Sequence, residues 1–211
     1  MEANIYQAIA GGKRLGIMGG TFDPIHYGHL VAAETARVEF DLDNVLFIPT
    51  GKPPHKLNHK ITNAYERFAM VQMSIKNNKY FKVSNLEIER EGPTYTIDTL
   101  KILHELLPKQ ELYFITGTDA LLDLLTWREA DNIFKMAKII GASRPGYDSR
   151  KFFAEITKRY PNIKDRIFEL EVPALAISST DIRARVKNKK SIRYLLPDEV
   201  RLYIKEHKLY Q

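Results

Sequence analysis

Two histidines stand where a glycine-containing turn runs into a predicted helix. Residues 19–30 read GGTFDPIHYGHL, directly after an apolar run at 15–18 that we predict to be a strand. His26 and His29 are three residues apart, so both imidazoles can point to one side of the helix. Glycines let a phosphate approach the backbone, and the start of a helix offers N–H donors with a partial positive charge. The segment therefore suits the binding of phosphate groups.

Phosphoryl or nucleotidyl transfer uses donors placed in this way, because negative charge develops on the non-bridging phosphate oxygens. Spacing alone leaves another role open, in which the two histidines only cap or pack the first helical turn. A metal site has less support, since neither a third ligand at a recognisable spacing nor an H-E-x-x-H pattern is present. The absence of G-x-G-x-x-G argues against an oxidoreductase that holds NAD as a cofactor.

A second helix start stands near the other end of the chain, where residues 177–183 read ISSTDIR. Ser178, Ser179 or Thr180 would cap a helix, and the aspartate that follows them suits its first turn. The same hydroxyls, together with Arg183, could bind phosphate, because arginine forms two parallel hydrogen bonds to it. Either role is compatible with the residues themselves.

Short β-rich runs alternate with helical patterns, which is typical of a parallel sheet with crossover helices. After the first strand, we predict strands at 45–49, 81–85, 112–116, 137–142 and 167–172. Helices are predicted at about 28–40, 63–76, 95–107 and 149–160, with two more that start near residue 178 and after residue 197. No linker divides the chain. We expect one α/β domain at 15–211, with 178–211 as a small C-terminal helical subdomain and 1–14 as an N-terminal extension.

Composition sets wider limits. The 211 residues, 44% of them hydrophobic, can bury one sizeable core. The lack of cysteine excludes disulfides and favours a cytoplasmic location, and no secretory signal or membrane-spanning run is expected. The formal charge of +6 suits polyanionic partners, but a solvated lysine-rich surface would explain it equally well.

Both motifs resemble signatures of the nucleotidyltransferase superfamily. GGTFDPIHYGHL matches G-G-x-F-[DN]-P-x-H-x-G-H, and ISSTDIR matches I-S-S-T-x-I-R, at every defined position. The resemblance implies a Rossmann-like doubly wound sheet and catalytic roles for His26, His29 and Arg183. The ATP-binding residues that it implies are Gly19, Gly20, Thr21, Phe22, Asp119, Ile177, Ser178 and Ser179.

The acceptor is suggested by a closer resemblance to bacterial nicotinate mononucleotide adenylyltransferases. GPTYTIDTL at 92–100 is similar to their G-P-S-Y-T-x-D-T string, with Thr94 in place of serine. The resemblance implies that Tyr95 and Thr96 lie at the nicotinate carboxylate, and that Trp127 stacks on the pyridine ring. Asp119 would approach the ribose. Trp127 could instead be a packing residue, and Asp119 could instead cap a helix.

The resemblance implies ATP and nicotinate mononucleotide as substrates, and deamido-NAD and pyrophosphate as products. No general base is needed, because a phosphate monoester has its second pKa near 6 and is already mostly a dianion. We expect Mg²⁺ to arrive with ATP and no metal site on the protein itself. Lys52, His55 and Lys56, in the proline-containing loop at 50–61, could close over the phosphates or form a plain solvated loop.

Alternatives remain. A sister enzyme would use phosphopantetheine, glycerol phosphate or nicotinamide mononucleotide, and a nucleotide sensor would keep the fold without turnover. A nucleic-acid binder could use the basic residues at 183–193, but only Tyr194 is an aromatic partner there. We therefore expect neither a nucleic-acid nor a membrane partner, and we leave a homo-oligomer open.

Overall fold

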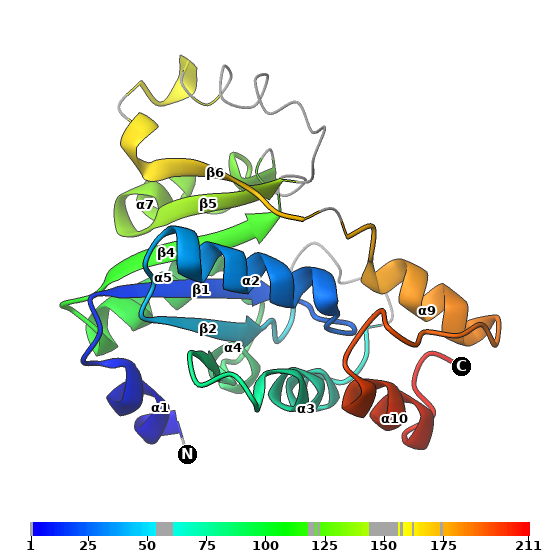
Figure 1. The fold of residues 1–211 in the computed structure, drawn as a ribbon. Helices are drawn as coiled ribbons and strands as arrows, with labels where there is room; N and C mark the ends of the chain where they lie inside the picture. Colours follow the sequence, from blue (N-terminus) through cyan, green and yellow to red (C-terminus); the bar gives the residue numbers. More distant parts are fainter. Residues whose placement is uncertain are drawn as a thin grey trace.

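A parallel sheet lies at the centre of the computed structural model (Figure 1). The structure describes residues 2–53, 61–117, 121, 123–143, 156, 158–161, 163–173 and 175–211. Within these residues the strands are β1 (Arg14–Gly20), β2 (Asn44–Pro49), β3 (Phe81–Val83), β4 (Glu111–Gly117), β5 (Lys138–Ser143) and β6 (Ile167–Glu171). They confirm the strands predicted from the sequence, with ends that differ by one or two residues.

The order of the strands is β3-β2-β1-β4-β5-β6, and every neighbouring pair is parallel. The chain first builds outward from β1 to β3, then returns to the other side of β1 and builds outward to β6. The predicted doubly wound sheet is therefore confirmed. Sheets of this kind bind ligands beyond the carboxyl ends of the strands where the order reverses, which here is between β1 and β4.

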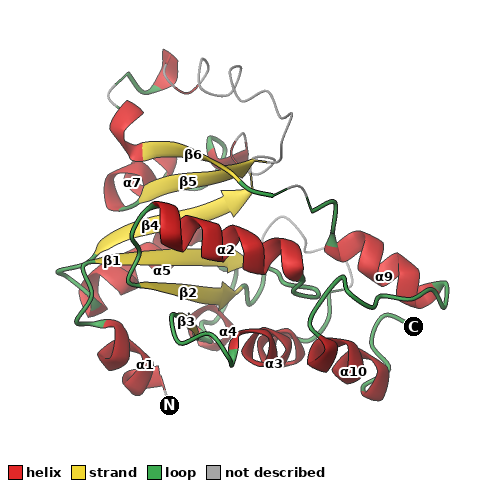
Figure 2. Cartoon of the chain, in the orientation of Figure 1, coloured by secondary structure: helices red, strands yellow, loops and turns green. Residues whose placement is uncertain are grey.

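Helices cover both faces of the sheet, with α2 in front of it and α5 behind it in Figure 2. The described helices are α1 (Glu2–Ile9), α2 (Tyr27–Glu39), α3 (Ala64–Ile75), α4 (Leu86–Glu89), α5 (Thr96–Leu106), α7 (Ala130–Met136), α9 (Ser179–Lys187) and α10 (Asp198–Glu206). Five of these were predicted, and α1, α4 and α7 were not. Most of the helix predicted at 149–160 lies outside the described residues.

Strand side chains alternate between two hydrophobic clusters, as the two-residue period of a strand requires. In β2, Val45 and Phe47 belong to the cluster with α2, α3, α9 and α10, whereas Leu46 and Ile48 belong to the cluster with α1, α5 and α7. All four side chains are fully buried, which explains why this strand is a continuous apolar run in the sequence. The C-terminal helices share the first cluster; their description as a subdomain stays a prediction.

The N-terminal segment, which lies outside the family resemblance, is packed onto the fold. Ile9 is completely buried in the second cluster, and its carbonyl accepts a hydrogen bond from the side-chain amide of Gln110. The hydroxyls of Tyr6 and Ser84 are 2.9 Å apart. Residues 6–9 therefore contribute to the core of the described structure.

Candidate active site

The turn after β1 holds the two histidines against each other. Their ring centroids are 3.7 Å apart with an interplanar angle of 27°, and the His26 backbone N–H donates to His29 Nδ1 at 3.3 Å. Because His29 Nδ1 accepts, the proton of the neutral ring must be on Nε2. Burial lowers the pKa of His29 well below its ordinary value, and the neighbouring His26 lowers it further. His29 therefore presents a neutral Nε2–H donor at neutral pH.

Gly28 leaves room for the two stacked histidine rings, and Phe22 packs against one of them. A Cβ on Gly28 would lie 3.0 Å from His26 Nδ1, so a larger residue would push the His26 ring away from its place. Phe22 has a φ of 49°, a left-handed conformation that is rare for a bulky residue. Its buried ring packs edge-on against His29 at 5.1 Å, which helps to hold this strained backbone in place.

The second motif meets the first at the same turn. Ser179 Oγ donates to the Pro24 carbonyl at 2.8 Å, and Arg183 Nη1 donates to the Asp23 carbonyl at 2.8 Å. Ser178 caps α9 by accepting a hydrogen bond from the Asp181 N–H at 3.1 Å. The start of α9 is thus bonded to the turn that leads into α2, about 150 residues earlier in the sequence. The hydroxyls of both serines are used within the protein, and Arg183 Nη2 donates to Thr180 Oγ1 at 3.3 Å.

A cavity of about 800 Å³ opens at the carboxyl edge of the sheet, where β1 and β4 meet. Its size is in the range of known small-molecule sites. Gly19, Gly20 and Thr21 line one part of it, beside the histidine turn, and His26, His29 and Arg183 lie outside its lining.

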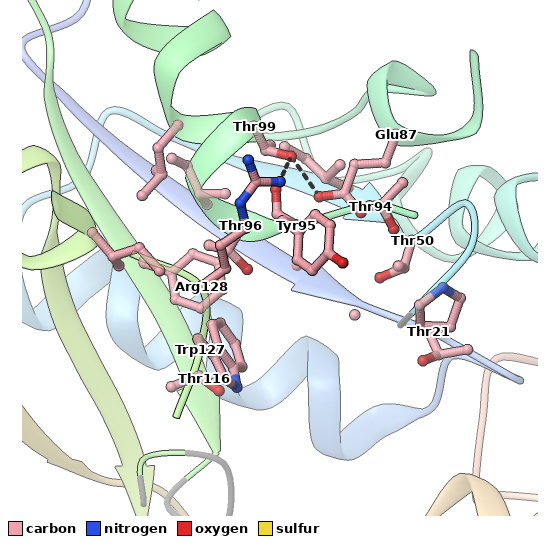
Figure 3. A pocket seen from close by; sticks show the side chains of 18 of the residues that line it. Thr21, Thr50, Glu87, Thr94, Tyr95, Thr96, Thr99, Thr116, Trp127 and Arg128 are labelled. Atoms are coloured by element: carbon pink, nitrogen blue, oxygen red, sulfur yellow. Dashed lines mark hydrogen bonds between the residues drawn. The ribbon is translucent and has the colours of Figure 1, made fainter. Parts of the chain in front are cut away.

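The opposite part of the cavity is formed by the start of α5 and the segment before α7 (Figure 3). Thr96 is the first residue of α5, and Tyr95 is its N-cap. The half-buried Trp127 packs edge-on against Phe114, with ring centroids 6.0 Å apart, and both line the cavity. The Arg128 guanidinium lies 4.9 Å from the centre of the Tyr95 ring. This part of the cavity offers aromatic surface and a helix N-terminus.

Sequence reasoning missed Glu87, a buried carboxyl that lines the cavity. Thr99 Oγ1 donates to Glu87 Oε1 at 2.7 Å, and burial raises the pKa of this carboxyl. Arg90 donates both to Thr99 Oγ1 and to the Tyr95 carbonyl. This network fixes the turn that leads into α5, and no feature of the sequence singled it out.

Arg67 was also missed, although its spacing contained a signal. It lies on the buried face of α3 with Met70, Val71 and Ile75, at helical spacing, and only 1% of it is exposed. Its guanidinium donates to the carbonyls of Thr21 at 2.6 Å, Thr50 at 2.7 Å and Thr62 at 2.9 Å. Arg67 therefore ties together the loops that follow β1 and β2 and the segment that leads into α3.

Three candidate residues, His55, Lys56 and Asp119, lie outside the described residues. Lys52 is described and exposed, and its carbonyl accepts from the Thr94 N–H at 3.0 Å. The part of the chain that the structure describes contains no group of three histidine or acidic side chains arranged to hold a metal ion. Nor does that part include a helix with the length and apolar character needed to cross a membrane.

Comparisons with known proteins show which family this chain belongs to. Residues 17–185 match the family model described as cytidylyltransferase-like. The chain is 56% identical over 199 residues to a probable nicotinate-nucleotide adenylyltransferase of Desulfitobacterium hafniense, covering 94% of this chain and 96% of the relative. It is 50% identical to a protein of the same description from a Thermoanaerobacter species, covering 94% of each. A similar fold is found in a solved structure of Plasmodium falciparum nicotinic acid mononucleotide adenylyltransferase complexed with NaAD. The TM-score is 0.78 at 23% sequence identity, and the match covers 94% of this chain and 97% of that chain.

Proposed function

The chain belongs to the cytidylyltransferase-like family of nucleotidyltransferases, and from this premise we propose that it transfers the adenylyl group of ATP to nicotinate mononucleotide. The products are deamido-NAD and pyrophosphate, and the reaction is a step of NAD biosynthesis. The relatives that match nearly the whole chain at about half identity carry the name of this activity. The observation that carries the proposal is that the start of α9 is bonded to the turn before α2, beside a cavity with an aromatic far wall.

The chemistry requires charge stabilisation more than proton transfer. An oxygen of the acceptor phosphate attacks the α-phosphorus of ATP, and the bond from that phosphorus to the oxygen bridging it to the β-phosphorus breaks. The electron pair of this bond leaves with pyrophosphate. Since the acceptor phosphate is already mostly a dianion at neutral pH, no side chain has to act as a base. The residues have to position the phosphates and stabilise the developing charge.

Three side chains take these roles in the proposal. His29 donates from Nε2, the tautomer that its bond from the His26 N–H selects, to a non-bridging phosphate oxygen. His26, stacked on it, faces the same phosphates. Arg183, fixed through the Asp23 carbonyl, holds the departing pyrophosphate. Gly19, Gly20 and Thr21 provide the backbone against which ATP lies.

ATP enters as its Mg²⁺ complex in this proposal. The phosphates themselves supply the oxygen ligands that Mg²⁺ prefers. When bound with ATP, Mg²⁺ would neutralise charge on the triphosphate. The absence of cysteine from the sequence supports a cytoplasmic location for the reaction.

The test is a panel of acceptors. The protein is incubated with ATP and Mg²⁺ and with nicotinate mononucleotide, nicotinamide mononucleotide or phosphopantetheine, and the initial rate of pyrophosphate release is measured. CTP with glycerol phosphate is the fourth arm. We expect the highest rate with nicotinate mononucleotide. A higher rate in another arm would replace the proposed acceptor, and no release in any arm would remove the proposed activity.

Trp127 gives a prediction that is specific to the acceptor. Trp127→Ala should raise the KM for nicotinate mononucleotide about fivefold, because offset ring stacking stabilises by about 1 kcal/mol. Trp127→Phe keeps an aromatic ring and should recover part of the loss. The KM for ATP is the internal control and should stay unchanged. An equal rise in both KM values would mean that Trp127 only packs against Phe114.

A further inference from the structure

The C-terminal end of the chain reaches back to the phosphate-binding turn. Tyr210 Oη donates to Asp23 Oδ1 at 2.8 Å, across 187 residues of sequence. The Tyr210 ring is partly buried and packs against the cluster that contains Phe22 and Ile182. Burial and the charge of Asp23 raise the pKa of Tyr210, so the phenol is a protonated donor at neutral pH.

Asp23 is the residue at which several segments of the site converge. It is buried, with 6% of its surface exposed, and it lies three positions before His26. Its backbone carbonyl accepts from Arg183, and its side-chain Oδ2 accepts from the Thr62 N–H at 3.4 Å. A buried carboxylate is stable only while donors surround it. Among the described residues, Tyr210 supplies the shorter of two hydrogen bonds to the Asp23 side chain, and so contributes strongly to its position.

The backbone turns back after α10, and this turn brings Tyr210 to Asp23. Lys208 and Tyr210 both have positive φ values, 53° and 63°, which cost free energy in residues other than glycine. The Leu209 N–H donates to the Ile204 carbonyl at 3.0 Å, which turns the chain back after the end of α10. Strained residues persist where surrounding contacts compensate for them, and the bond to Asp23 is such a contact.

We propose that Tyr210 is a positioning residue for adenylyl transfer. It touches no substrate. It holds the Asp23 side chain, and Asp23 in turn holds the Arg183 guanidinium and the chain that leads to His26. The inference rests on the proposed function, and it adds that the last residues of the chain are part of the working site.

The test compares two tyrosines of the C-terminal segment that each have a carboxylate neighbour. Tyr210→Phe removes only the hydroxyl that bonds to Asp23. Tyr203→Phe is the matched control, because its phenol, also in the C-terminal segment, forms a hydrogen bond with a carboxylate, Glu66. Burial and that hydrogen bond raise the pKa of Tyr203 to about 12. Glu66 is on α3 and makes no described contact with the histidine turn.

We expect Tyr210→Phe to lower kcat about tenfold, which is the size of effect given by a hydrogen bond to a charged group, and to leave the KM for nicotinate mononucleotide unchanged. Tyr203→Phe should keep the wild-type kcat. Asp23→Asn should lower kcat as well, and adding Tyr210→Phe to it should cause no further loss, since both changes disrupt the same contact.

The outcomes are distinguishable. If the wild type forms no dinucleotide, the proposed function itself is wrong. If the wild type is active and Tyr210→Phe has the same kcat as Tyr203→Phe, only the role of Tyr210 is wrong. The folded fraction of each variant is measured by circular dichroism at the assay temperature. A loss of kcat that equals the loss of folded protein would also overturn the positioning role.

Discussion

Replacing His29 with alanine lowers kcat about 100- to 1,000-fold and changes the KM for ATP only slightly, the result expected when one preorganised donor to the transition state is lost. The expectation rests on the ring's protonation. His29 Nδ1 accepts from the His26 N–H, and burial keeps the pKa of His29 low, so a neutral Nε2–H is in place before ATP binds. Such a donor needs no reorganisation when charge develops on the phosphate oxygens.

The measurement is steady-state release of pyrophosphate, with His207→Ala as the control. His207 is exposed, stacks on Tyr203 and lies beside Glu66, and it makes no described contact with the histidine turn, so its loss should leave kcat unchanged. The His29 variant also needs a folding check, because its ring contributes to the first turn of α2. Turnover at the wild-type rate in folded His29→Ala protein would mean that His29 only caps the helix.

The fold was predictable from the sequence where a local residue pattern indicates how a segment is buried. β2 and β4 are buried on both faces, and their continuous apolar runs show it. α1 and α7 were missed, because both are short, with eight and seven residues, and α7 has no side-chain cap as a signal. At the N-cap of α7, Glu129 has a φ of 54°, a conformation that residue type does not predict.

The residues of the candidate site also divide into those with a local sequence signal and those without one. The positions of His26, His29 and Arg183 near helix starts could be predicted from motif spacing, and their catalytic roles stay a prediction. Tyr210 and Arg67 could not be predicted, since their partners are distant in sequence. The Tyr210 hydroxyl bonds to Asp23 across 187 residues of sequence, which no local pattern signals. An arginine in an amphipathic helix is ordinarily expected at the surface, and only tertiary structure brings buried carbonyls to it.

Arg67 gives the largest expected effect on stability. Arg67→Met should lower the free energy of unfolding by about 3–5 kcal/mol, because three carbonyl acceptors lose their donor at once. The carbonyls of Thr21, Thr50 and Thr62 would each lose their Arg67 donor. An unsatisfied buried acceptor costs about 1–3 kcal/mol, whereas methionine restores only apolar contact.

The cost of burying the Arg67 cation opposes this loss of stability. Burial lowers the pKa of Arg67, while the charge of Asp23 acts in the other direction, so holding the buried cation is itself costly and its removal recovers part of that cost. Among the described residues, no carboxylate lies within ion-pair distance of Arg67, and its bonds go to neutral carbonyls. We expect the unsatisfied carbonyls to dominate, because they belong to three separate segments that have no common alternative donor.

Urea unfolding of Arg67→Met beside Arg201→Met decides between these two effects. Arg201 forms a surface ion pair with Asp198 on α10, and the same substitution there should cost at most about 1 kcal/mol. If both variants unfold at the same urea concentration, the relief of desolvation cancels the lost hydrogen bonds, and Arg67 is not what holds the loops after β1 and β2. If Arg67→Met is less stable than Arg201→Met by the expected margin, Arg67 maintains the backbone conformation of the proposed ATP site. The reason is that its single guanidinium binds the carbonyls of both Thr21 and Thr50.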